Sequence, residues 1–111
     1  MKEKAFAFID SKKDEMLSLW QELGNTESGS HDIDGVDRVA AKVRQQLEHA
    51  GGKTRLVEFP EAGNMVIAEL AGGDKPCAML MGHIDTVFKT GEIKERPFTI
   101  KDGKAYGPGV L

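Results

Sequence analysis

The period at which apolar residues recur changes once along this chain, at Gly51-Gly52. Before these glycines, apolar residues are spaced three and four positions apart, which is the spacing that gives an α-helix one apolar face. After them, apolar and polar residues alternate, as expected of a half-exposed β-strand. The change of period predicts helices followed by strands, and therefore an α/β fold class.

Two helices are expected before the change. The apolar positions of the first fall within residues 5–23, and Gly24-Asn25 supplies a stop signal. Those of the second form one continuous stripe within residues 36–47. The polar segment 25–35 between them is expected to be a loop, and its last acidic residues can cap the second helix.

The second half of the chain predicts a mixed β-sheet. Strands are expected within residues 54–59 and 64–70, and a short hairpin within residues 98–106. Cys77–Met81 is apolar without a break, which predicts a central strand buried on both faces, with an inert thiol and with helices covering the sheet. Residues 1–111 are therefore expected to form one α/β domain of two helices followed by a mixed β-sheet.

Composition limits the function classes. With 111 residues, of which 40% are hydrophobic and 30% charged, the chain can build the core of a single domain. The net charge is −3 and the 15 basic residues are scattered, so a nucleic-acid partner is not expected. No apolar run approaches the roughly 18 residues of a membrane span. The absence of a signal-peptide pattern and the single cysteine predict a cytoplasmic location.

The residues with the clearest chemical potential follow the predicted central strand. In open α/β sheets, ligands bind beyond the carboxyl ends of the strands, where His83 and Asp85 lie. Residues two apart in an extended segment share a face. A neutral imidazole is a good zinc ligand, and a nearby carboxylate can orient it by an outer hydrogen bond. Spacing alone leaves the alternative open that the pair only satisfies polar groups at a strand end.

The segments around this pair resemble those of a known family. Residues 79–87, Met-Leu-Met-Gly-His-Ile-Asp-Thr-Val, are similar to the first metal-binding signature of the di-zinc peptidases and deacylases that include acetylornithine deacetylase, succinyl-diaminopimelate desuccinylase and glutamate carboxypeptidase. Residues 96–110 are similar to the Pro-Phe, Asp-Gly and Tyr-Gly-x-Gly stretch that leads to the second signature. Residues 27–30 and 35–37, together with Gly107-Pro108-Gly109, resemble the glutamate carboxypeptidase branch.

The resemblance implies that residues 1–111 are the N-terminal portion of a zinc-peptidase catalytic domain. His83 would be a ligand of one zinc ion, and Asp85 would be the assisting catalytic carboxylate. The complete enzyme would hold two zinc ions and cleave an amide bond of a small peptide or an N-acyl amino acid. In the family, a bridging aspartate, paired glutamates, a further acidic ligand, a distant histidine and an inserted lid or dimerisation domain come later, and none has a position in these 111 residues.

A catalytic zinc ion needs about three protein ligands and a water, and the reaction needs a general base. One imidazole cannot supply this set, so we expect an enzyme fragment of the metallo-carboxypeptidase type that is inactive alone. The alternative is a non-catalytic α/β interaction module that retains the first half of the fold. An exposed sheet edge is expected to favour self-association. The sequence favours neither peptides nor N-acyl amino acids as the substrate, and neither zinc nor cobalt nor manganese as the metal.

Overall fold

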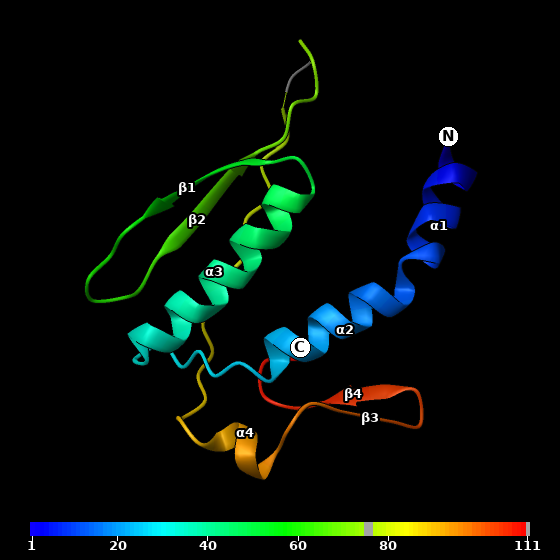
Figure 1. Cartoon of the computed structure of the whole chain (residues 1–111). Helices are drawn as coiled ribbons and strands as arrows, with labels where there is room; N and C mark the ends of the chain where they lie inside the picture. Colours follow the sequence, from blue (N-terminus) through cyan, green and yellow to red (C-terminus); the bar gives the residue numbers. More distant parts are fainter. Residues whose placement is uncertain (75–76, 111) are drawn as a thin grey trace.

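The computed structural model describes residues 1–74 and 77–110, and it has the α/β composition that the change of period predicts (Figure 1). Its helices are α1 (Lys2–Ser11), α2 (Lys13–Gly24), α3 (Ile33–His49) and α4 (Glu92–Glu95). Its strands are β1 (Lys53–Val57), β2 (Met65–Glu69), β3 (Thr99–Lys101) and β4 (Lys104–Tyr106). Within this described part, no helix is long and apolar enough to cross a membrane.

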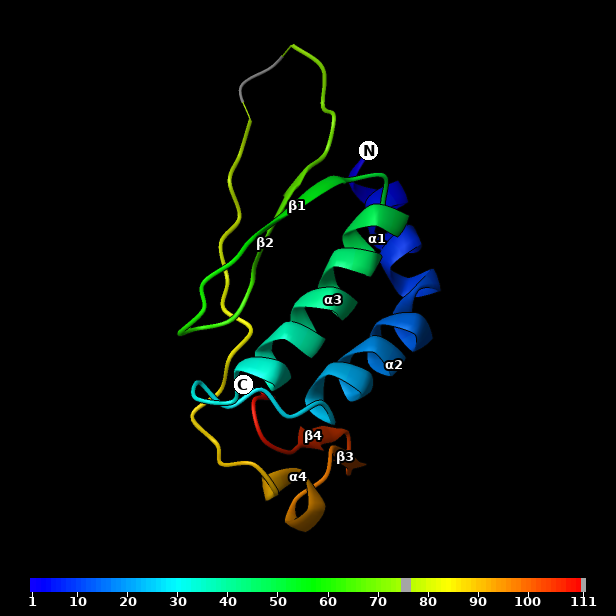
Figure 2. The same ribbon diagram turned by 60° about the vertical axis from the view of Figure 1, so that its left-hand side comes forward.

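Helix α3 and the β1–β2 hairpin pack together, and we call them the α3–hairpin unit (Figure 2). The apolar stripe predicted for this helix supplies its core, because Val36, Val39 and Ala40 are buried. Asp32 caps the helix, since its Oδ1 accepts a hydrogen bond from the Gly35 amide at 2.9 Å. The second predicted helix, its acidic cap and the two strands that follow it are confirmed.

The turn between β1 and β2 is fixed against the start of α3. Gly63 is buried with φ +88°, and a Cβ added there would lie 2.7 Å from Cγ1 of Val36. The next amide, of Asn64, donates a hydrogen bond to Oδ1 of Asp37 at 2.7 Å. Only glycine fits this close approach at a positive φ, so this position couples the hairpin to the helix.

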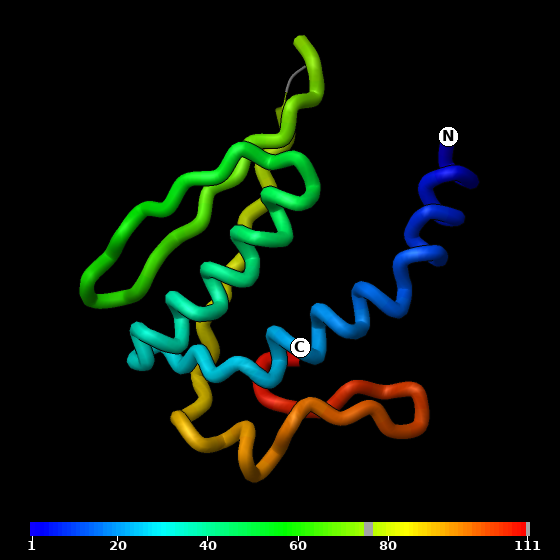
Figure 3. Tube along the Cα trace, viewed as in Figure 1, coloured from blue at the N-terminus to red at the C-terminus, as the bar shows by residue number. Residues whose placement is uncertain are grey.

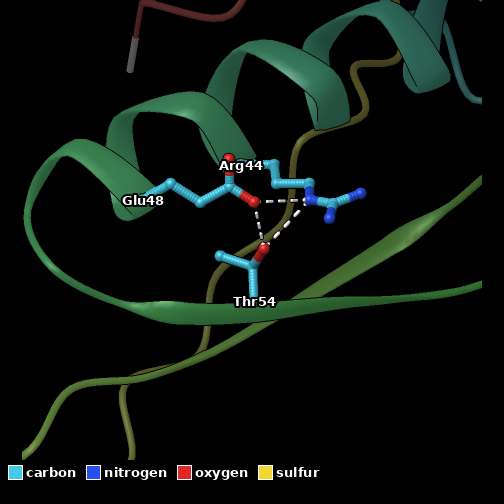
Figure 4. A network of polar contacts seen from close by, with 3 residues as sticks. All are labelled: Arg44, Glu48 and Thr54. Carbon is cyan, nitrogen blue, oxygen red and sulfur yellow. Dashed lines mark hydrogen bonds and ion pairs between the residues drawn. The ribbon is translucent and has the colours of Figure 1, made fainter.

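A polar network joins the other end of α3 to β1 (Figure 4). Nε of Arg44 donates to Oε1 of Glu48 and to Oγ1 of Thr54, both at 2.9 Å. The Thr54 hydroxyl donates to the same Glu48 oxygen at 2.5 Å. These hydrogen bonds, first from Thr54 and then from Arg44, lower the pKa of Glu48. The network fixes the turn that follows the helix.

The first predicted helix is two helices, so the prediction of one continuous helix over residues 5–23 was wrong. Helices α1 and α2 meet at Lys12, whose φ of −102° and ψ of 4° are not helical. Just before the break, the Ser11 hydroxyl donates to the carbonyl of Phe8 at 2.7 Å. Serine side chains compete in this way with the helical backbone. Helix α1 then diverges from α3 (Figure 1), and α2 ends at Gly24 as predicted.

The predicted central strand at Cys77–Met81 does not form, and this expectation was wrong. The side chains of Met79, Leu80 and Met81 are 82%, 95% and 87% exposed, and the Cys77 thiol is exposed as well. Figure 3 shows the trace returning past the α3–hairpin unit without joining it as a third strand. A strand buried on both faces needs a hydrogen-bonded neighbouring strand and helices that cover it. Among the described residues, no strand pairs with this segment and no helix covers it.

The sheet is consequently two separate hairpins instead of one mixed sheet. β1 pairs with β2 and β3 pairs with β4, both antiparallel, while parallel pairing within residues 1–74 and 77–110 is confined to one isolated bridge between Gly29 and Thr86. Each strand of a two-stranded sheet is an edge strand, so the edge on which self-association was predicted exists. Self-association itself stays a prediction.

The predicted hairpin at residues 98–106 is confirmed as β3–β4. Its turn places Asp102 and Gly103 at φ 51° and 72°, which is the conformation that Asp-Gly favours between antiparallel strands. The residue before β3, Phe98, is buried, and Trp20 of α2 meets its ring edge-on with centroids 5.4 Å apart. This aromatic pair docks the hairpin on the last turns of α2.

Candidate functional site

The loop after α2 forms a backbone bridge to the segment that carries the candidate site residues. We call residues 25–30 the anchoring loop and residues 82–91 the site segment. The amide of Thr86 donates to the carbonyl of Ser28 at 2.7 Å, and the amide of Ser30 donates to the carbonyl of Thr86 at 2.8 Å. These two bonds make the parallel bridge and fix the backbone next to Asp85.

Asp85 is held by a side chain of the anchoring loop. The Ser30 hydroxyl donates to Oδ2 of Asp85 at 2.6 Å, and it also lies 3.0 Å from the carbonyl oxygen of Thr86. This hydrogen bond is the main cause that lowers the pKa of Asp85; its own amide and the nearby His83 act in the same direction, against burial. Asp85 is therefore a carboxylate at neutral pH.

The ring of His83 faces this carboxylate. Nδ1 of His83 lies 2.9 Å from the carbonyl oxygen of Asp85 and 3.3 Å from its Oδ1. Both neighbours are acceptors, so a neutral ring carries its proton on Nδ1 and its lone pair on Nε2. The structure thus brings His83 and Asp85 into contact, while their roles as zinc ligand and catalytic carboxylate stay predictions.

The two residues do not by themselves make a catalytic metal site. Across residues 1–74 and 77–110, no group of three or more His, Cys, Asp or Glu side chains is placed to hold a metal ion. A catalytic zinc ion has about three protein ligands, whereas the pair offers one imidazole and one carboxylate. The other two histidines, His31 and His49, are exposed surface residues.

A groove runs beside the pair. Its walls come from α2, α3, α4, the anchoring loop, the site segment and residues 108–109, and both His83 and Asp85 line it. Most of the other lining side chains from the helices are apolar, and they are Trp20, Leu23, Val39, Val43 and Ile93. Two acidic residues, Glu27 and Glu92, also line the groove. An apolar groove with a few polar groups is the usual form of a small-molecule site.

Sequence reasoning did not find the residues that hold the site segment in place. Besides Ser30, Oε1 of Glu27 accepts from the Gly91 amide at 2.5 Å. In the same loop, Oδ1 of Asn25 accepts from the Phe98 amide at 2.9 Å and so holds the residue before β3. The signal in the sequence is a polar loop of short side chains with hydrogen-bonding capacity. Nothing in that signal tells which distant amide or carboxylate each side chain meets.

No protein-family profile matches the sequence. Among curated proteins, the chain is similar to Carboxypeptidase G2 of Pseudomonas sp. (strain RS-16), with 26% identity over 97 residues. The match covers 86% of this chain and 23% of the relative, so the chain spans about a quarter of the relative's length. The similarity indicates a distant relation to the zinc-peptidase family.

Proposed function

We propose that this chain carries the first zinc-binding segment of a hydrolase that cleaves amide bonds of small peptides or N-acyl amino acids. The proposal assigns His83 as a zinc ligand through Nε2 and Asp85 as the assisting carboxylate. Its support is the similarity to a protein named as a carboxypeptidase, together with the contact between Asp85 and Nδ1 of His83. That contact is the single observation that carries the proposal.

The contact matters because a metal ligand must present a lone pair. An imidazole whose Nδ1–H faces a carboxylate or a carbonyl has its lone pair on Nε2, and such a partner raises the basicity of the ligand atom. The lowered pKa of Asp85 keeps this partner charged at neutral pH. A neutral His83 ring beside this carboxylate would present its Nε2 lone pair to a metal ion.

The proposal assigns the remaining metal ligands and the general base to residues outside these 111. A zinc ion supplies a polarised carbonyl and an activated water only when its ligand set is complete. The groove beside His83 and Asp85 would then form part of one wall of the substrate site. We expect the 111-residue chain alone to show no zinc-dependent hydrolysis of a dipeptide or an N-acyl amino acid.

A zinc titration followed by NMR of the histidine rings tests the ligand assignment. We expect Nε2 of His83 to shift first and furthest, with His31 and His49 as exposed controls in the same chain. Asp85→Asn keeps the shape but removes the charge, and we expect it to weaken zinc binding by about 10-fold, the lower end for loss of a partner to a metal-bound histidine.

The same titration separates this proposal from the alternative of a non-catalytic interaction module. A module without a metal role predicts that His83 responds no more strongly than His31 or His49. Equal shifts at all three rings, or a response of His83 that Asp85→Asn leaves unchanged, would contradict the metal assignment.

A further inference from the structure

We infer that Ser30 is a positioning residue that holds the Asp85 carboxylate against His83. The Ser30 hydroxyl donates to Oδ2 of Asp85 at 2.6 Å, while the other oxygen, Oδ1, lies 3.3 Å from Nδ1 of His83. One end of the carboxylate is thus occupied by the loop and the other faces the ring. The importance of this arrangement for catalysis rests on the proposed function. The arrangement itself is independent of that proposal.

The hydroxyl limits how Asp85 can turn. The Asp85 side chain is 41% exposed and that of His83 is 84% exposed, so little packing restricts either of them. An unpacked side chain keeps its rotamer freedom unless a directional bond removes it. With Oδ2 bound to Ser30, rotation of the carboxylate is restricted and Oδ1 stays on the side of His83.

Most of the anchoring of the loop does not depend on the Ser30 hydroxyl, which adds one contact to it, 3.0 Å from the carbonyl oxygen of Thr86. The bridge beside Asp85 uses only backbone atoms, namely the amides of Ser30 and Thr86 and the carbonyls of Ser28 and Thr86. A substitution at Ser30 keeps these atoms, so the site segment stays attached. Loss of the hydroxyl should therefore affect the orientation of Asp85 more than the fold.

The test uses Ser30→Ala in the full 111-residue chain. Ring nitrogen shifts of His83, measured at a fixed pH where the ring is neutral, give the ratio of its Nδ1–H and Nε2–H forms. In the unsubstituted chain we expect the Nδ1–H form to dominate. Ser30→Ala should lower the ratio about threefold, a modest change because the pair is partly exposed to water and the Asp85 carbonyl, 2.9 Å from Nδ1, stays as an acceptor.

Two variants control for this change. Ser30→Thr keeps a hydroxyl and should restore the ratio. Ser11→Ala removes another exposed hydroxyl bond, the one from Ser11 to the Phe8 carbonyl, and should leave the ratio unchanged. If the alanine variant loses its dispersed amide spectrum, Ser30→Cys, which has nearly the same shape but a weak donor, replaces it.

The inference is overturned if a folded Ser30→Ala or Ser30→Cys variant keeps the original ratio, if threonine fails to restore it, or if the unsubstituted His83 is mainly Nε2–H. These outcomes are independent of zinc. A chain with the expected ratios and no zinc response at His83 would overturn the proposed function and leave the inference standing. A zinc response at His83, together with a ratio that Ser30→Ala leaves unchanged, would overturn the inference and leave the proposed function standing.

Discussion

The α3–hairpin unit and the site segment are held in place by different forces. In the unit, α3 packs against β1 and β2 and carries the buried residues Val36, Val39 and Ala40, so many weak apolar contacts act together. The site segment is instead attached by individual hydrogen bonds from the anchoring loop, including those at Ser28 and Ser30. The stability of the α3–hairpin unit depends on the volume and the spacing of its apolar side chains. The attachment of the site segment depends on single polar atoms.

This difference predicts how each region responds to substitution. A shape change within the unit should cost folding free energy, because close-packed interiors tolerate misfit poorly. Loss of one polar atom in the anchoring loop should cost less and act on a defined neighbour, since the net value of one hydrogen bond is about 0.5–1.5 kcal/mol. The substitutions below test the contrast, starting with the larger effect.

Gly63→Ala should have the largest effect. The new Cβ would lie 2.7 Å from Cγ1 of Val36, at a backbone φ of +88° that alanine rarely adopts. Backbone strain and overpacking together should lower the free energy of unfolding by about 2–4 kcal/mol. Urea unfolding followed by circular dichroism measures this loss.

Gly51→Ala is the matched control for that substitution. Gly51 has nearly the same φ, +85°, but a Cβ there has no atom within 4 Å. Gly51→Ala should therefore lower the free energy of unfolding only through backbone strain, by about 1 kcal/mol. Equal losses at the two glycines would mean that Gly63 does not pack against α3, and the comparison between the two regions would fail.

Asn25→Ala should have a smaller and more local effect. It removes the acceptor of the Phe98 amide and leaves that amide of a buried residue without its partner. We expect a loss of about 1–2 kcal/mol and a change in the fluorescence of Trp20, whose ring contacts Phe98. Asn25→Asp retains an acceptor oxygen and should preserve most of the stability and most of the Trp20 fluorescence. An aspartate variant that behaves like alanine would show that the side-chain acceptor is not what matters.

The parts of the fold that were predicted correctly depend on local or periodic signals. The stripe from Val36 to Leu47 specifies α3, because a helix with one apolar face needs no information beyond its own spacing. Asp32 as a helix cap and Asp102-Gly103 as a hairpin turn are likewise read from a few adjacent residues.

The parts that were not predicted depend on neighbours. An apolar run such as Cys77–Met81 predicts a buried strand only if other strands and helices cover it, and the run itself carries no information on whether they do. The break at Lys12 is set by competition between a serine hydroxyl and the helical backbone, which periodicity does not register.

The candidate site divides in the same way. The contact of His83 with Asp85 follows from a spacing of two residues, and sequence reasoning placed both at the site. The hydrogen bond from Ser30 to Asp85 joins residues 55 positions apart, so it emerges only from the folded chain. The sequence predicts a polar loop at residues 25–35, but it does not predict which residues this loop contacts.

Amide hydrogen exchange tests most directly whether the site segment is held by the anchoring loop instead of by a sheet. The account predicts slow exchange at the amide of Thr86, which donates to Ser28, and near-unprotected exchange at the amides of Ala78 and Leu80, which lie in no strand. Protection at Ala78 and Leu80 equal to that of the β1 and β2 amides, with Thr86 unprotected, would contradict it.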